Sequence, residues 1–214
     1  MVIIGAGGFA REVLQVLIGN RSVKNIAFYD DVTPNSSSFV FDTFPVLKSP
    51  EELQQFFSSN GNEFVLGLGN SFLREKMLKK INDFGGELVS AIDSKASIGQ
   101  FCKLDEGATI LAHSCLSNGS IIGKAPLIYY NSIVTHDCVI GDFVELSPGA
   151  TLLGHVHVGS YTQIGANATV LNRIQIGDNC IIGAGAVVTK NVPSHTVVAG
   201  VPARVIKKLD LNQI

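Results

Sequence analysis

The chain has 214 residues, of which 46% are hydrophobic, and a formal net charge of −2. This length suits one or two domains with a sizeable core, and the charge argues against nucleic acid as a partner. No apolar run is long enough to cross a membrane, and the first residues lack the basic start of a signal peptide, so we expect a cytoplasmic protein.

The first expected element is a short buried strand, Val2–Ile4, which leads directly into the glycine-rich turn 5–10. Residues 11–18 then have the apolar spacing of a helix. A strand, a glycine turn and a helix in this order open a nucleotide-binding βαβ unit, because the glycines admit a phosphate to the backbone and the helix N-terminus offers free N–H groups. The spacing also fits G-x-G-x-x-A, so a dinucleotide site is an alternative.

Two further strands are expected in this region. The first, 26–29, ends in Asp30 and Asp31, whose carboxylates are suited to accept hydrogen bonds from a ribose or a base. The second, 64–69, leads into a helix over 72–82. All these elements precede residue 89 and amount to half of a doubly wound fold, which is enough for one nucleotide but not for two.

We therefore expect an α/β half-Rossmann domain over residues 1–88 and a second domain over residues 89–214. The first domain is predicted to bind a nucleotide or a nucleotide sugar. A dinucleotide-dependent oxidoreductase and a purely structural domain are the alternatives.

A period of six dominates the second domain. Every sixth residue from Ile92 to Val188 is Ile, Leu or Val, without a slip of register. This period fits neither an α-helix nor a hairpin, but it is typical of a hexapeptide β-helix, whose aliphatic side chains stack inside a triangular prism with roughly 18 residues per coil. Antiparallel strands with coincidental spacing are the alternative, and the handedness of the coil does not follow from the period.

One polar pair in the prism, His136 and Asp137, is a candidate catalytic site. Residues one coil apart should stack, which places Gly154 over His136 and His155 beside Asp137. A histidine that takes a proton, an acid that sets its tautomer and a backbone N–H that stabilises an oxyanion are the parts of an acyl-transfer site. The alternative is a solvated corner pair. Because neighbours on a strand point to opposite faces, the two side chains can cooperate only at a corner or a bulge.

The other polar candidates are assigned structural roles. His113, His157 and His195 are expected to lie on the surface. No two of the five histidines are five residues apart, as the zinc-binding pair of the β-helical carbonic anhydrases is, so no metal is expected. The cysteines are expected to be reduced and packed, because Cys102 and Cys138 would lie two coils apart, beyond the reach of a disulfide.

Several motifs together resemble one family, the bacterial sugar O/N-acyltransferases of the sialic-acid O-acetyltransferase and UDP-4-amino-sugar N-acetyltransferase type. The resemblance covers nearly the whole chain. It is carried by the unbroken hexads and by the segments 5–9 (Gly-Ala-Gly-Gly-Phe), Asp30-Asp31, Gly69-Asn70, His136-Asp137 and 199–204 (Ala-Gly-Val-Pro-Ala-Arg).

The resemblance implies a left-handed β-helix that assembles as a homotrimer, with acetyl-CoA in the groove between two subunits and the nucleotide of the sugar in the N-terminal domain. His136 is similar in position to the family's general base, and Asp137 to the acid that raises its basicity. The implied contacts to the nucleotide sugar are Gly7, Gly8, Phe9, Asp30, Asp31, Gly69 and Asn70. The implied contacts to coenzyme A are Glu145, Gly154, Ala166 and Ala184.

Two of these positions depart from the family pattern. Many members have a histidine where this chain has Phe9, and some have a second histidine near coenzyme A where this chain has Glu145. The first change either removes a polar contact to the nucleotide or replaces it by stacking, and the second leaves a carboxylate to accept a hydrogen bond.

The leading hypothesis is an acetyltransferase that moves acetyl from acetyl-CoA to an amino group of a nucleotide-activated sugar, with His136 as general base. Transfer to a sugar hydroxyl is the nearest alternative. A non-catalytic assembly protein that senses a nucleotide and a zinc-dependent β-helical lyase are the others.

Overall fold

A computed structural model describes residues 1–20, 25–33 and 37–210. The chain divides into two compact units, Met1–Ser94 and Lys95–Ile214. The boundary expected after residue 88 lies at the end of strand β6, shortly before this division.

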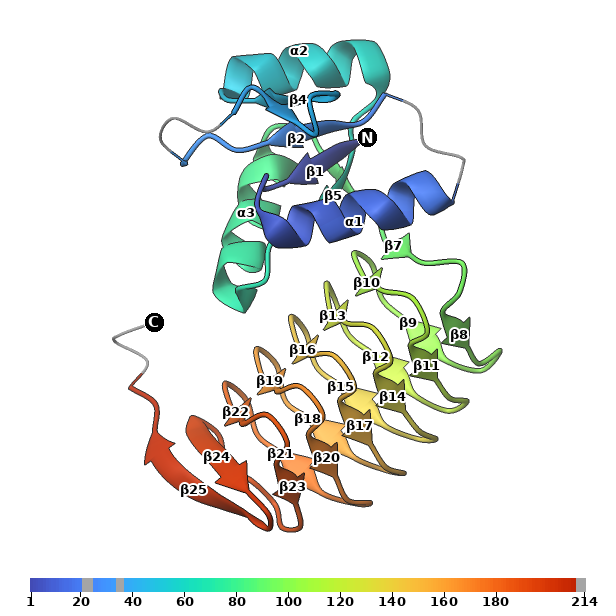
Figure 1. Ribbon diagram of the computed structural model, residues 1–214, viewed down its shortest axis with the longest axis vertical. Helices are drawn as coiled ribbons and strands as arrows, with labels where there is room; N and C mark the ends of the chain where they lie inside the picture. The colour runs from blue at the N-terminus through green and yellow to red at the C-terminus, as the bar shows by residue number, and fades with distance from the viewer. Residues whose placement is uncertain (21–24, 34–36, 211–214) are drawn as a thin grey trace. The chain divides into compact units, whose positions relative to one another are not determined.

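Unit 1 is built on a six-stranded sheet with the order β3-β4-β2-β1-β5-β6, which is parallel except for the β3–β4 pair (Figure 1). Three helices connect its strands, and the short strand β7 follows β6. The elements are β1 (Val2–Ile4), α1 (Gly8–Gly19), β2 (Ala27–Tyr29), β3 (Phe39–Val40), β4 (Phe44–Leu47), α2 (Pro50–Asn60), β5 (Glu63–Leu66), α3 (Ser71–Asp83), β6 (Glu87–Leu88) and β7 (Ala91–Ile92).

Two predicted boundaries in unit 1 are wrong by a few residues. Helix α1 begins at Gly8 rather than Arg11, so the glycine turn supplies the first turn of the helix and its unpaired N–H groups. Strand β5 ends at Leu66 rather than at residue 69. At Gly67 a Cβ atom would lie 2.8 Å from the side chains of Ile3 and Ala10, so the chain leaves the sheet where α1 packs closely against it.

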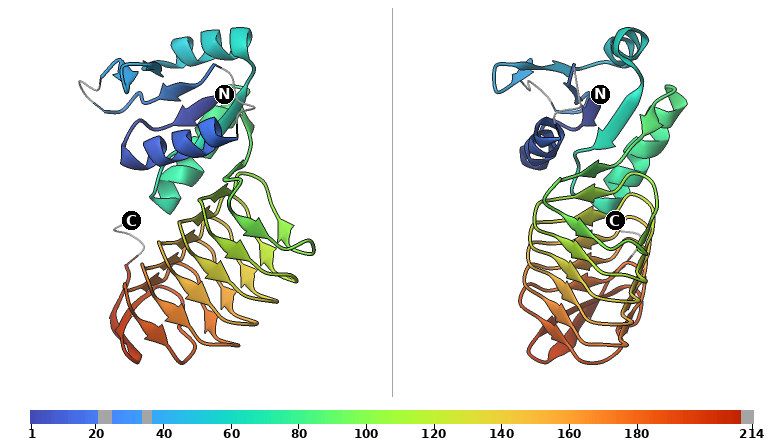
Figure 2. Two further views of the ribbon diagram at one scale, coloured as in Figure 1. Left: turned by 45° about the vertical axis from the view of Figure 1, so that its right-hand side comes forward. Right: turned by 90° about the vertical axis from the view of Figure 1, so that its right-hand side faces the viewer.

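Unit 2 is the predicted prism, formed by three stacked columns of short parallel strands (Figure 2). The first face contains β10 (Thr109–Ile110), β13 (Leu127–Ile128), β16 (Glu145–Leu146), β19 (Gln163–Ile164), β22 (Ile181–Ile182), β24 (Thr196–Gly200) and the antiparallel β25 (Ala203–Lys208). The second contains β8 (Ser97–Ile98), β11 (Cys115–Leu116), β14 (Ile133–Val134), β17 (Thr151–Leu152), β20 (Thr169–Val170) and β23 (Val187–Val188). The third contains β9 (Lys103–Leu104), β12 (Ile121–Ile122), β15 (Val139–Ile140), β18 (His157–Val158) and β21 (Gln175–Ile176).

The period of six explains this stacking. The second residue of each two-residue strand is one of the hexad aliphatics and points inward, as Val134 and Leu152 do on neighbouring coils with no exposed surface. Removing these side chains from water is the main favourable contribution to the folding of the prism. The corners require a left-handed backbone conformation, which Asn167 (φ 56°) and Asn179 (φ 55°) adopt at modest cost.

None of the helices in the described ranges has the length and apolar character that a membrane span needs.

Candidate functional site

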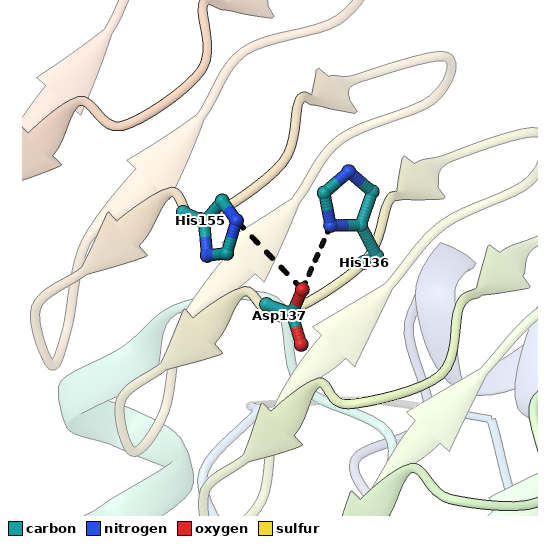
Figure 3. A group of neighbouring side chains, drawn as sticks. All are labelled: His136, Asp137 and His155. Atoms are coloured by element: carbon teal, nitrogen blue, oxygen red, sulfur yellow. Dashed lines mark hydrogen bonds and ion pairs between the residues drawn. The ribbon is translucent and has the colours of Figure 1, made fainter.

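The polar pair of the prism lies at a corner, where the chain leaves strand β14. Asp137 has a left-handed backbone (φ 58°), which turns the chain so that two sequence neighbours face the same side. His136 Nδ1 and Asp137 Oδ2 are 2.8 Å apart, and the two side chains are 60% and 50% exposed (Figure 3). The corner geometry therefore meets the condition for cooperation between the two residues.

A glycine on the next coil makes room for the imidazole. A Cβ atom at Gly154 would lie 2.6 Å from both Cε1 and Nε2 of His136, which is closer than real Cβ contacts. On the previous coil, a Cβ atom at Gly119 would collide with the carboxylate of Asp137. The predicted stacking of Gly154 over His136 is thus confirmed, and both members of the pair occupy spaces that glycines keep open.

A second histidine, His155, completes the group. Its Nε2 lies 3.8 Å from Asp137 Oδ2, and its ring stands edge-on to that of His136 with the centroids 5.2 Å apart (Figure 3). The backbone N–H of His155 donates to the carbonyl oxygen of His136 at 3.1 Å, which ties the two coils together. The stacking arithmetic predicted this proximity, but it assigned no role to His155.

The other predicted coenzyme contacts in the prism lie away from the His136–Asp137 corner. Ala166 and Ala184 stack at the corner after the first face, where the N–H of Gly185 donates to the carbonyl oxygen of Ala166 at 2.8 Å. Glu145 lies on the first face, and its Oε1 accepts a hydrogen bond from Gln163 Nε2 at 3.1 Å. His136 and Gly154 stand at the corner after the second face. Within one chain, the predicted base and most of the predicted coenzyme contacts thus belong to different edges of the prism.

Of the other histidines, His113 and His157 are exposed as expected. His195 lies at the surface but is half-buried. Its Nδ1 is buried and has no hydrogen-bond partner among the described residues.

A cavity of about 440 Å³ opens in unit 1 at the carboxyl ends of strands β1, β2 and β5. It is lined by three stretches that the sequence singled out and by one face of α3, which the sequence did not: Gly5–Phe9, Tyr29–Thr33, Gly67–Gly69, and Leu73, Lys76, Met77 and Lys80. At Gly7, Gly8 and Gly69, a Cβ atom would meet nothing within 4 Å, so the backbone is open to the cavity.

Asn70 is the one predicted substrate contact that does not line this cavity. Its side chain caps helix α3 instead, because Oδ1 accepts a hydrogen bond from the backbone N–H of Leu73 at 2.9 Å.

The two acids in the cavity have different surroundings. Asp30 accepts hydrogen bonds from its own loop, including one from Thr33 Oγ1 at 2.7 Å. Asp31 Oδ2 accepts hydrogen bonds from Lys80 Nζ and, at 2.9 Å, from the hydroxyl of Tyr29, while its buried Oδ1 has no partner among the described residues. Burial alone would raise the pKa of Asp31, but the bonds from Lys80 and Tyr29 hold it below its usual value.

The same contact acts on Tyr29 in the opposite direction. Burial raises the pKa of this hydroxyl above its usual value, and the hydrogen bond to Asp31 raises it further. Tyr29 therefore stays protonated and remains a hydrogen-bond donor. The sequence did not indicate that Lys80 lines this cavity, because a lysine on an amphipathic helix is ordinarily expected to be solvated.

Both units have relatives of known structure. Residues 1–81 match the PglD N-terminal domain family, and residues 155–190 match the bacterial transferase hexapeptide (six repeats) family. GDP-perosamine N-acetyltransferase of Escherichia coli O157:H7 is 30% identical over 164 residues, which is 72% of this chain and 70% of that protein.

Two solved structures extend over nearly the whole chain. A variant of perosamine N-acetyltransferase from Caulobacter crescentus, in complex with CoA and GDP-perosamine, is 30% identical with a TM-score of 0.89, covering 97% of this chain and 96% of that one. The acetyltransferase domain of PglB from Neisseria gonorrhoeae FA1090, in complex with acetyl coenzyme A, is 27% identical with a TM-score of 0.87, covering 96% and 98%. The expected fold is thereby confirmed: a Rossmann-like α/β domain followed by a left-handed parallel β-helix.

Proposed function

Because this chain belongs to the hexapeptide-repeat sugar acyltransferases, the family that includes GDP-perosamine N-acetyltransferase, we propose that it moves acetyl from acetyl-CoA to an amino group of a nucleotide-activated sugar. The observation that carries the proposal is the exposed His136–Asp137 pair beneath Gly154. The Nδ1 of His136 is engaged with Asp137 and its side chain is 60% exposed, which leaves Nε2 as the nitrogen for a general base.

The proposed reaction uses few protein groups. The amine of the sugar attacks the thioester carbonyl of acetyl-CoA while His136 Nε2 takes the proton from the nitrogen. Asp137 holds the other imidazole nitrogen in its protonated form and stabilises the imidazolium. The N–H of Gly154 is the proposed donor to the oxyanion. The tetrahedral intermediate then collapses, the C–S bond breaks, and the proton passes from His136 to the CoA thiolate.

Coenzyme A is proposed to bind between subunits of a homotrimer. His136 and Gly154 stand at one edge of the prism, whereas Ala166 and Ala184 stand at another, with Glu145 on the adjoining face. A single elongated ligand can contact both sets where the edge of one protomer meets the neighbouring edge of the next, and closed rotational symmetry repeats this junction three times.

The cavity in unit 1 is proposed to hold the nucleotide part of the substrate. Gly7 and Gly8 open the N-terminus of α1 to phosphate, and Lys76 and Lys80 add positive charge on the facing helix. Asp31 supplies a carboxylate for the ribose or base, and Phe9 supplies a ring for stacking.

Filling this cavity should weaken nucleotide-sugar binding selectively. In Gly8→Val, the new side chain enters open space in the cavity that the nucleotide would fill. Overpacking costs about 1–3 kcal/mol, so KM for the nucleotide sugar should rise about tenfold or more. Gly19→Val is the matched control, because Gly19 ends the same helix, also faces open space and does not line the cavity. Equal KM values for the two variants would argue against this site.

Replacing the acid should have a smaller effect than replacing the base. We expect Asp137→Asn to lower kcat by less than the factor of about 10²–10⁴ that is typical of removing a general base. The amide oxygen of asparagine can still accept the hydrogen bond from Nδ1–H and keep Nε2 free, but it carries no charge to stabilise the imidazolium. Steady-state kinetics over a range of pH check this. A variant with unchanged kcat and an unchanged pH profile would remove Asp137 from the mechanism.

The decisive assay measures thiol release from acetyl-CoA against a panel of UDP-, GDP- and dTDP-linked amino sugars and their hydroxyl analogues. We expect turnover with at least one amino sugar and none with its hydroxyl analogue. Turnover of the hydroxyl sugar alone would establish O-acetylation, and nucleotide binding without CoA binding in calorimetry would favour the non-catalytic alternative.

The reaction is proposed to take place in the cytoplasm. All four cysteines are free, and burial raises the pKa of the Cys138 thiol. Unpaired thiols of this kind fit a reducing compartment.

A further inference from the structure

His136, Asp137 and His155 offer two imidazoles and one carboxylate, and their ligating atoms all lie within 4.8 Å of one another (Figure 3). We propose that these three residues form a binding site for a divalent transition metal, with zinc as its probe, and that the bound metal switches off the acetyltransferase. The second half of this proposal rests on the proposed role of His136 as general base.

The donor set is one that zinc prefers. Two histidines and one carboxylate, with a fourth position left for water, make a common zinc site, with metal–ligand distances of about 2.0–2.2 Å and thus about 3.3 Å between neighbouring ligand atoms. The observed separations from Asp137 Oδ2, 2.8 Å to His136 Nδ1 and 3.8 Å to His155 Nε2, lie on either side of this value. The side chains are half-exposed, so small rotations close the site.

The backbone already holds the ligands at fixed positions. Asp137 and His155 occupy the same left-handed corner on successive coils, with φ of 58° and 60°. The hydrogen bond from the N–H of His155 to the carbonyl oxygen of His136 fixes the separation between the two coils. Binding therefore requires ordering of side chains only, and a site on rigid elements keeps its geometry better than a site on loops.

Metal binding is incompatible with base catalysis through the imidazole itself. In the proposed resting state, Nδ1–H donates to Asp137 and Nε2 keeps the lone pair that takes the proton. A metal on Nδ1 displaces that proton, and the neutral ring then carries its hydrogen on Nε2, which can no longer accept one. A metal on Nε2 uses the lone pair directly. Either mode removes the base.

The test replaces His155 with asparagine, a residue that already stands at other left-handed corners of the prism. Asn131, Asn167 and Asn179 occupy left-handed corners with φ of 55–58°, so His155→Asn should fold normally. His113→Asn is the matched control, because His113 is an exposed corner histidine with φ of 63° outside the cluster. Both variants and the unaltered protein are titrated with zinc chloride in a calorimeter. Acetyl transfer by each is measured with zinc, with magnesium, and with zinc followed by EDTA, relative to its own metal-free rate.

We expect the unaltered protein and His113→Asn to bind one zinc per chain and to lose activity reversibly with zinc but not with magnesium. His155→Asn should bind zinc at least about tenfold more weakly and resist inhibition correspondingly. No stoichiometric zinc binding, or equal binding by His155→Asn, would overturn the site. Zinc binding that depends on His155 but leaves activity intact would support the site and instead contradict the assignment of His136 as base.

Discussion

Replacing His136 with alanine should lower kcat by about 10²–10⁴-fold and change KM for either substrate much less. The imidazole is the proposed acceptor of the amine proton, and that transfer occurs only in the transition state. Its side chain is 60% exposed, so its loss should leave the prism folded. Steady-state kinetics with acetyl-CoA and the best amino sugar, together with thermal unfolding, measure both effects.

His113→Ala is the control for this experiment. It removes another exposed histidine from the prism, outside the His136–Asp137–His155 group, and should keep full turnover. If His136→Ala retained the turnover of the unaltered protein, the base would have to be another residue.

Adding one methyl group at Gly154 should be nearly as damaging as losing the base. The new Cβ would overlap the His136 ring, whose Cε1 and Nε2 lie 2.6 Å from its position. The imidazole must then swing away, and a displacement of about 1 Å in a catalytic group can cost about 10²-fold in rate. We expect Gly154→Ala to lower kcat by this order of magnitude and to unfold at nearly the temperature of the unaltered protein.

A double variant separates displacement of the base from other effects of the methyl group. If Gly154→Ala acts by moving the imidazole, adding it to His136→Ala should cost nothing further in kcat. Losses that multiply in the double variant would show that Gly154 contributes independently, as the proposed oxyanion donor would. Full activity of the single variant would mean that the ring has room to move without loss of function.

The register of the coils was predictable because only one register places all the aliphatic side chains inside the prism. Each strand places one aliphatic side chain inside, so a slip of one residue would expose every one of them to water. The pairing of Val134 with Leu152 on the next coil follows directly from the sixfold pattern. The same arithmetic placed Gly154 over His136 and His155 beside Asp137.

The nucleotide-binding half was predictable in its motifs but not in all of its lining. The glycine turn and the acids Asp30 and Asp31 lie where a βαβ unit requires them, at the carboxyl ends of parallel strands. Lys80 reaches Asp31 only because α3 packs beside the edge where β2 ends, and no local pattern in the helix marks that contact.

The amino-acid sequence by itself determined the repeating coil and the half-Rossmann unit, because both follow from local periodicity and from turns that only glycine-rich segments make. The tertiary structure alone decided how the polar side chains meet. Alternation along a strand would separate His136 from Asp137, and only the left-handed corner at Asp137 turns them to the same side. The sixfold spacing placed His155 beside Asp137, but the edge-on contact between the rings of His155 and His136 depends on side-chain directions that only the stacked coils define.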